Sequence, residues 1–193
     1  REIAALSDWV QGIAHLTRGK TESAIESLDK AADFFYLEGH DLTGAQTQVS
    51  KLMALAMLGR YCEALACGKT VLKIFVKNKD HLAAGKVEHN LGNILMRQEH
   101  YREAQKYLIS ARKRFLQIDN QSQVTMAENA LAIIYALQND FRSAEKLYAD
   151  ALVRAQKLNM RVTQAEIEAS MGNLALFRGS FKTALELLES SRE

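Results

Sequence analysis

The chain has 193 residues, and its 25 basic and 23 acidic side chains leave a net charge of +2, which excludes the strongly basic surface typical of nucleic-acid and anionic-membrane binding. Hydrophobic residues make up 48% of the chain, aromatic residues only 7%, and proline is absent, so the composition favours helices over sheets. No apolar run approaches the roughly 20 residues that span a bilayer, and we expect a cytoplasmic protein without a membrane or nucleic-acid partner.

Ten helices separated by short turns are expected along the chain. Gly, Asn and Asp recur where each amphipathic segment ends, and Gly or Asn can adopt the left-handed conformation that terminates a helix. In chain order, the expected helices cover residues 2–18, 21–38, 43–58, 61–77, 82–98, 101–118, 122–138, 141–158, 162–178 and 181–193.

A repeat of constant length relates these helices in pairs. One alanine recurs in every period, and an aromatic residue, or Thr21 in the first period, precedes it by three positions. A small alanine lets the second helix of each pair approach the first closely, so the repeat predicts helical hairpins. The alanines are Ala24, Ala64, Ala104, Ala144 and Ala184. We expect one domain over 1–193, with hairpins at about 1–40, 41–80, 81–120, 121–160 and 161–193.

Two segments carry a family signature. Leu91-Gly92-Asn93-Ile94-Leu95, followed by Tyr101-Arg102-Glu103-Ala104, resembles the tetratricopeptide repeat, as does Met171-Gly172-Asn173-Leu174 followed by Phe181 and Ala184. The resemblance extends over the whole chain and implies an all-α fold, a right-handed α-solenoid of five hairpins. The 40-residue period exceeds the usual period of about 34 and is similar to the longer repeats of kinesin light chains.

The second repeat departs from this pattern. Leu52 stands where the other first helices carry a small residue, and Gly68 stands where the second helices carry a large one. We hypothesise that Leu52 fills the space that Gly68 leaves.

A narrower resemblance concerns the parent protein. Ala45–Lys51, Gly59-Arg60-Tyr61 and Gln164–Glu168 resemble the repeat arrays that precede caspase-like CHAT protease domains in bacterial proteins. The chain starts at Arg1 and stops inside an expected helix, so we expect a fragment of a longer protein. The resemblance therefore implies an alternative to a simple binding scaffold, a sensor that controls an attached protease, ATPase or transcription factor.

The chain offers little for catalysis, and we expect no enzyme activity, no cofactor and no metal. Its five histidines form no metal-binding spacing, and Cys62 and Cys67 lack the two-residue gap of a zinc or redox pair. The carboxylates Glu88, Glu128 and Glu168 follow the repeat, which indicates a structural role. We expect the basic run at 112–114 to lie on a solvated outer face.

We expect a protein or peptide partner to bind in a concave groove formed by the first helices, because stacked hairpins expose such a surface. Positions spaced by three, four and seven residues share one helix face. The polar part of this groove, where asparagines can bond a peptide backbone, is predicted at Lys86, His89, Asn90, Asn93, Arg97, Asn129, Ile133, Asn173 and Phe177. An apolar part is predicted at Trp9, Ile13, Val49, Met53 and Met57.

Other roles for the same residues stay open. Asn93 and Asn173 could bond within their own hairpins, and Trp9, Met53 and Met57 could pack under another repeat or domain of the parent protein. Self-association through the C-terminal end is also expected, because the last helix is short and Leu185 and Leu188 should be only partly covered.

Overall fold

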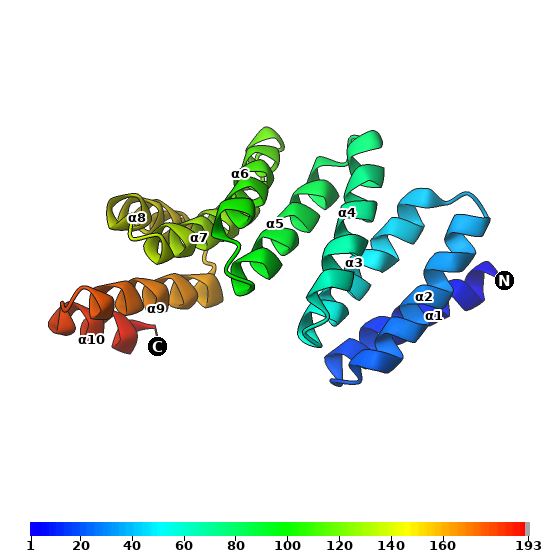
Figure 1. Cartoon of the computed structure of the whole chain (residues 1–193), viewed down its shortest axis with the longest axis horizontal. Coiled ribbons are helices and arrows are strands. Elements are labelled where there is room, and N and C mark those ends of the chain that lie inside the picture. The colour runs from blue at the N-terminus through cyan, green and yellow to red at the C-terminus, as the bar shows by residue number, and fades with distance from the viewer. Residues whose placement is uncertain (192–193) are drawn as a thin grey trace. The chain divides into compact units, whose positions relative to one another are not determined.

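The structure, a computed structural model, describes residues 1–191, in which all regular secondary structure is helical. Successive helices form antiparallel hairpins, as the pairs α1–α2 and α9–α10 show (Figure 1). Helices α1 to α9 begin and end within two residues of the expected bounds, and α10 ends at Ser190, so the expected helix at 192–193 lies outside the described residues. The helices are α1 (Glu2–Thr17), α2 (Thr21–Leu37), α3 (Asp41–Met57), α4 (Tyr61–Lys77), α5 (His81–Arg97), α6 (Tyr101–Gln117), α7 (Gln121–Leu137), α8 (Phe141–Lys157), α9 (Arg161–Phe177) and α10 (Phe181–Ser190).

All turns between these helices have the same backbone form. In the first turn Gly19 has a φ of 71°, its N–H donates to Leu16 O at 3.1 Å, and the N–H of Lys20 donates to His15 O at 2.9 Å. These two bonds satisfy carbonyls that the helix end leaves open. The left-handed residue recurs once per helix at a constant interval, at Gly19, Gly39, Gly59, Lys79, Glu99, Asp119, Asn139, Asn159 and Gly179.

A small residue facing a large one lets the two helices of a hairpin approach closely. A Cβ built on Gly12 would lie 2.7 Å from Leu28 Cγ, and one on Gly172 would lie 2.8 Å from Leu188 Cγ. The second hairpin carries the same pair in reverse, because a Cβ on Gly68 would lie 2.5 Å from Leu52 Cδ1. Leu52 therefore occupies the space beside Gly68, as the volume-compensation hypothesis expects.

The helices group into two compact units, Arg1–Ile94 and Leu95–Glu193, and the boundary falls inside α5. In the first unit, Ala5, Ala31 and Phe35 form a core cluster. In the second, Tyr148, Ala151 and Ile167 belong to a core cluster. The expectation of a single domain stays a prediction.

None of the helices within residues 1–191 combines the length and the apolar composition that crossing a membrane would require.

Candidate functional site

The first helices of the second unit form a pocket. Helices α7 and α9 contact each other, and a cavity of about 410 Å³ opens between them, with α8 contributing to its wall. Three of the predicted groove residues line it, namely Ile133, Asn173 and Phe177. Leu137, one turn after Ile133 on the same helix, also lines it. The sequence analysis did not single out the remaining lining residues as binding residues, and these are Ala136, Asn139, Tyr148, Ser170 and Leu174.

The pocket is apolar inside and polar at a few points. Tyr148 is buried, and burial raises its pKa to about 12, although the hydrogen bond with Ser170 acts in the opposite direction. The phenol therefore stays neutral at physiological pH and keeps its O–H as a donor. Asn139 and Asn173 are exposed amides. A pocket of this size with few polar groups is typical of a ligand site, and the amides suit a peptide backbone.

Phe177 stands at the edge of this pocket with 74% of its surface exposed. Its ring lies 5.9 Å from that of Phe141, and the Arg178 guanidinium lies 5.8 Å from the Phe141 ring centre. Arg178 also pairs with Glu145. The aromatic contact restrains Phe177 while leaving most of its surface free for a partner.

One register position of the first helices carries buried polar atoms without hydrogen-bond partners. These atoms are Trp9 Nε1, His89 Nδ1 and Asn129 Oδ1, whose residues occupy the same position of the first, third and fourth repeats. Burial lowers the pKa of His89 to about 4, so its imidazole is neutral at pH 7. His89 and Asn129 are half-buried, which limits how much of either side chain can meet a partner.

The first unit has its own, smaller pocket on the first helices. Val49 of α3 and Lys86 of α5 line it, together with Phe75 of α4, in a cavity of about 260 Å³. Met53 and Met57 are exposed on α3. The role of Val49, Met53, Met57 and Lys86 as groove residues stays a prediction.

Trp9 differs from a groove residue in its packing. Its ring meets Phe35 edge-on at 6.4 Å and lies against the cluster of Ala5, Ala31 and Phe35. Ile13 is exposed, and the structure adds Ile3 and Val10, which the sequence analysis did not name. Ile3, Leu6 and Val10 are also exposed, and their spacing of three and four residues puts all four on one face of α1. That spacing was the signal that could have found them.

The remaining predicted residues are distributed over both units. Asn90 and Asn93 are half-buried on α5 in the first unit, and Arg97 is exposed at the end of α5 in the second.

A buried ion cluster joins the second helices to α7. Glu128 is 1% exposed, and its carboxylate accepts from Arg112 Nε at 2.7 Å and from Arg154 Nη1. Arg112 keeps 40% of its side chain exposed, but its guanidinium also compensates a buried charge, which the expectation of a solvated basic face did not include. Lys113 is exposed, as expected.

The periodic carboxylates have the structural role that their spacing indicated. Glu88 is buried on α5, and Glu168 of α9 accepts from Gln164 Nε2 at 2.9 Å and Ser190 Oγ at 3.1 Å. In residues 1–191, no group of three metal-binding side chains is found.

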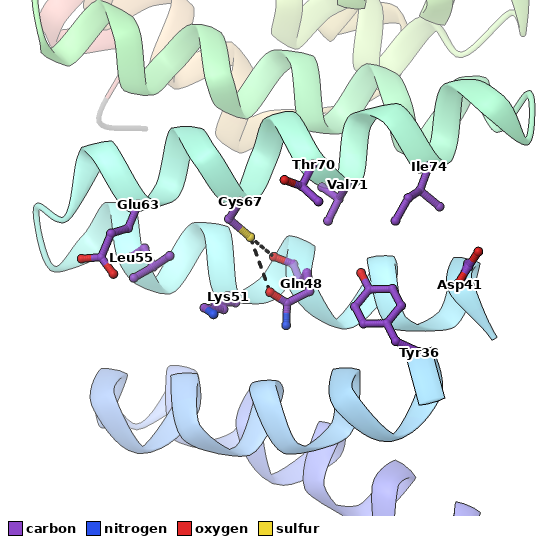
Figure 2. Close-up of a pocket in the computed structure, with 10 residues that line it drawn as sticks. All are labelled: Tyr36, Asp41, Gln48, Lys51, Leu55, Glu63, Cys67, Thr70, Val71 and Ile74. Atoms are coloured by element: carbon purple, nitrogen blue, oxygen red, sulfur yellow. Dashed lines mark hydrogen bonds between the residues drawn. The ribbon is translucent and has the colours of Figure 1, made fainter. Parts of the chain in front are cut away.

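A second kind of cavity lies in the first unit, between the second helices α2 and α4 and over α3. It measures about 500 Å³, and Figure 2 shows Tyr36, Gln48, Lys51 and Cys67 around it. The Cys67 thiol donates to the Gln48 carbonyl at 3.5 Å and to its amide oxygen at 3.6 Å. Burial raises the pKa of Cys67 to about 11, so the thiol is protonated and a poor nucleophile.

Comparison with known proteins places these observations in a family. Residues 83–157 match the family model described as tetratricopeptide repeat. No curated protein sequence matches the chain.

Solved structures share its fold at low sequence identity. Aspartyl phosphate phosphatase F from Bacillus subtilis has a TM-score of 0.85 at 13% identity, with 100% of this chain and 61% of that one covered. The kinesin light chain TPR-like repeats of Podosopora anserina give 0.78 at 16% identity, with 100% and 95% covered. The Rap conjugation gene regulator of the plasmid pLS20, in complex with the Phr* peptide, gives 0.74 at 16%, with 99% and 62% covered.

The chain thus spans less than two thirds of the length of the first and third of these structures. Residues 83–157 thus match the tetratricopeptide repeat, and the hairpins and the constant spacing of the turns give the described chain the fold of tetratricopeptide-type repeats.

Proposed function

We propose that this protein binds a segment of another protein along its first helices, with the pocket between α7 and α9 as the main anchor. The observation that carries the proposal is the pocket itself, where Ile133 and Phe177 supply apolar walls and Asn173 supplies an exposed amide. An apolar side chain of the partner would enter the pocket, and the amide would bond the partner's backbone. A backbone-directed amide allows binding without a strict sequence requirement.

The comparisons support a peptide as the ligand. One structure of the same fold is a complex with the Phr* peptide. In the first unit, exposed Lys86 beside Val49 favours an acidic residue in the partner, and exposed Arg97 makes the same contribution in the second. An exposed ion pair contributes only about 0–1 kcal/mol, so these cations would adjust affinity and the pocket would dominate it.

The test uses a peptide selected from a display library against the purified chain, with affinity measured by fluorescence anisotropy. Asn173→Ala should weaken binding by about 1–3 kcal/mol if its amide is desolvated in the complex. Phe177→Ala should also weaken binding, since an aromatic contact surface is lost. Lys113→Ala, an exposed change on α6, is the matched control. Full affinity in both pocket variants, together with a loss in the control, would place the binding surface on the second helices.

A regulatory module is the second candidate, and one observation favours it. The pLS20 structure, which has the same fold, is that of a gene regulator holding its peptide. If the chain relays ligand binding to an attached effector, the selected peptide should change hydrogen exchange in α8 and α10 as well as at the pocket. Protection confined to α7 and α9 would support a scaffold alone.

A further inference from the structure

Helices α6, α7 and α8 show how a gap between two second helices is filled in this chain. Arg112 from α6 and Arg154 from α8 both reach the Glu128 carboxylate on α7. Two guanidinium groups thus occupy the space between the second helices and neutralise a carboxylate that has almost no contact with water.

The equivalent gap in the first unit lacks these side chains. A shift by two whole repeats brings Ala32 to the place of Arg112, Gln48 to the place of Glu128 and Ile74 to the place of Arg154. The neutral amide of Gln48 needs no cation, and the short side chains reach less far. The result is the open cavity of about 500 Å³ between α2 and α4.

The wall of this cavity contains a hydrogen-bond acceptor that receives only a weak hydrogen bond from its neighbours. The Gln48 amide donates from Nε2 to Asp29 Oδ1 at 3.1 Å, whereas within residues 1–191 its Oε1 accepts only from the Cys67 thiol at 3.6 Å, and a thiol is a weak donor. The Tyr36 ring lies close against α3 at Gly44, since a Cβ on Gly44 would lie 2.7 Å from Tyr36 Cε1. A planar cation can stack on such a ring.

The charges around the cavity favour a cation. Asp41 and Glu63 stand at its opposite ends in Figure 2. The cations nearby are already paired, Lys51 with Asp29 at 2.7 Å and Arg60 with Glu63 at 2.6 Å and Glu22 at 3.3 Å. The lining itself thus carries two carboxylates, Asp41 and Glu63, and one cation, Lys51, and among residues 1–191 Asp41 has no ion-pair partner.

We propose that the cavity between α2, α3 and α4 binds an arginine side chain of a protein partner. The guanidinium would take the place that Arg112 and Arg154 occupy in the second unit, donating to Gln48 Oε1 and lying against Tyr36. This site is separate from the pocket on the first helices, and it gives the second-helix surface a specificity of its own.

The test measures binding of acetyl-Gly-Arg-Gly-amide to the whole chain by the shifts of the Gln48 side-chain amide in NMR spectra. The arginine peptide should give a saturable shift. The matched peptide with neutral citrulline should bind at least tenfold more weakly, and the lysine peptide several-fold more weakly, because it lacks the planar fork. Absence of a saturable shift, or equal binding of the citrulline peptide, would overturn the proposal.

Two variants should change the affinity for the arginine peptide in opposite directions. A folding defect would only weaken binding, so an increase in affinity cannot come from misfolding. Gln48→Glu adds a charged acceptor and should tighten binding of the arginine peptide several-fold. Gln48→Glu with Ile74→Arg supplies the guanidinium from the chain itself and should abolish binding. Gln48→Glu with Val76→Arg, which adds the same charge at an exposed position outside the cavity lining, should retain it. Weaker binding in Gln48→Glu, or full binding in the Ile74→Arg variant, would contradict the assignment.

Discussion

Single residues in the turns carry a conformational cost that differs from turn to turn. The same left-handed backbone is occupied by glycine at four turns and by Lys, Glu, Asp or Asn at the other five. For a residue with a Cβ this conformation costs about 1–2 kcal/mol, and Asn and Asp tolerate it best. Lys79, with a φ of 57°, and Glu99, with a φ of 63°, are therefore the least suited residues in the set.

Replacing Lys79 by glycine should stabilise the fold. Glycine removes the steric cost but adds conformational entropy to the unfolded chain, so the expected gain is about 0.5–1 kcal/mol. Urea unfolding followed by circular dichroism measures it. Gly59→Ala is the control and should destabilise by a similar amount, because a Cβ there meets nothing within 4 Å and the cost is conformational alone. A neutral or destabilising Lys79→Gly would contradict this account of the turns.

His89 should make the fold sensitive to acid. Burial lowers its pKa from 6.5 to about 4, so protonation is easier in the unfolded chain. Its contribution to stability is complete above pH 6.5 and is lost as the pH falls from there towards 4, by roughly 3 kcal/mol in all. The free energy of unfolding of wild type minus that of His89→Gln, measured between pH 7 and pH 4, isolates this term. His40→Gln, an exposed change, should leave the pH profile of wild type intact.

Pairs of elements are held together by size matching, and the second hairpin shows that the match can be reversed. Gly12 with Leu28 places the small residue on the first helix, and Leu52 with Gly68 places it on the second. Either arrangement fills the space where the two helices cross. Each hairpin therefore requires a fixed combined volume of the two facing residues, and not a small residue on a particular helix.

A double-mutant cycle at Leu52 and Gly68 tests this requirement. Gly68→Leu should overpack the crossing and cost about 1–3 kcal/mol, and Leu52→Gly should leave a cavity and cost about 2–5 kcal/mol. The double variant restores the order of the first hairpin and should cost at least about 1 kcal/mol less than the sum. Some cost should remain, because Leu91 Cδ2 also lies 2.6 Å from a Cβ at position 68. Strict additivity would show that the two positions do not compensate each other.

At the scale of the whole chain, the periodic sequence predicted the helix bounds but not the pockets. Helix bounds followed from the sequence because the turn residues recur and the turn forms locally. The pockets did not follow, since they depend on which helices become neighbours. The cavity over Gln48 exists because Ala32 and Ile74 stand where Arg112 and Arg154 would fill it, and this comparison needs the structure.

Side-chain contacts were also hard to predict for Trp9 and Arg112, which combine an apolar part with a polar or charged group. Trp9 has the spacing of a groove residue, but its ring packs on Phe35. Arg112 belongs to a basic run that looks solvated, but it neutralises Glu128. In both cases the partner lies on another helix, and helical periodicity does not identify it.

The C-terminal helix should promote association of whole molecules. Phe181 and Leu185 of α10 are 71% and 59% exposed, and Leu188 is half-buried beside Gly172. We expect the average mass in sedimentation velocity to rise with concentration, and Leu185→Lys to suppress the rise. Leu37→Lys, at a position that is 86% exposed on α2, should leave it unchanged. Monomeric behaviour of wild type at all concentrations would refute the prediction.

The common turn geometry also bears on how the length of this protein can change. Since every described turn has the same form and recurs at a constant interval, a gene exchange between misaligned hairpins adds or removes whole repeats and joins helices through a turn of the existing type. A misalignment by a single helix would instead exchange the roles of first and second helices and separate each small residue from its large partner. The repeat array can therefore lengthen or shorten by complete hairpins without any new loop. The addition or loss of a single helix would be disfavoured by packing.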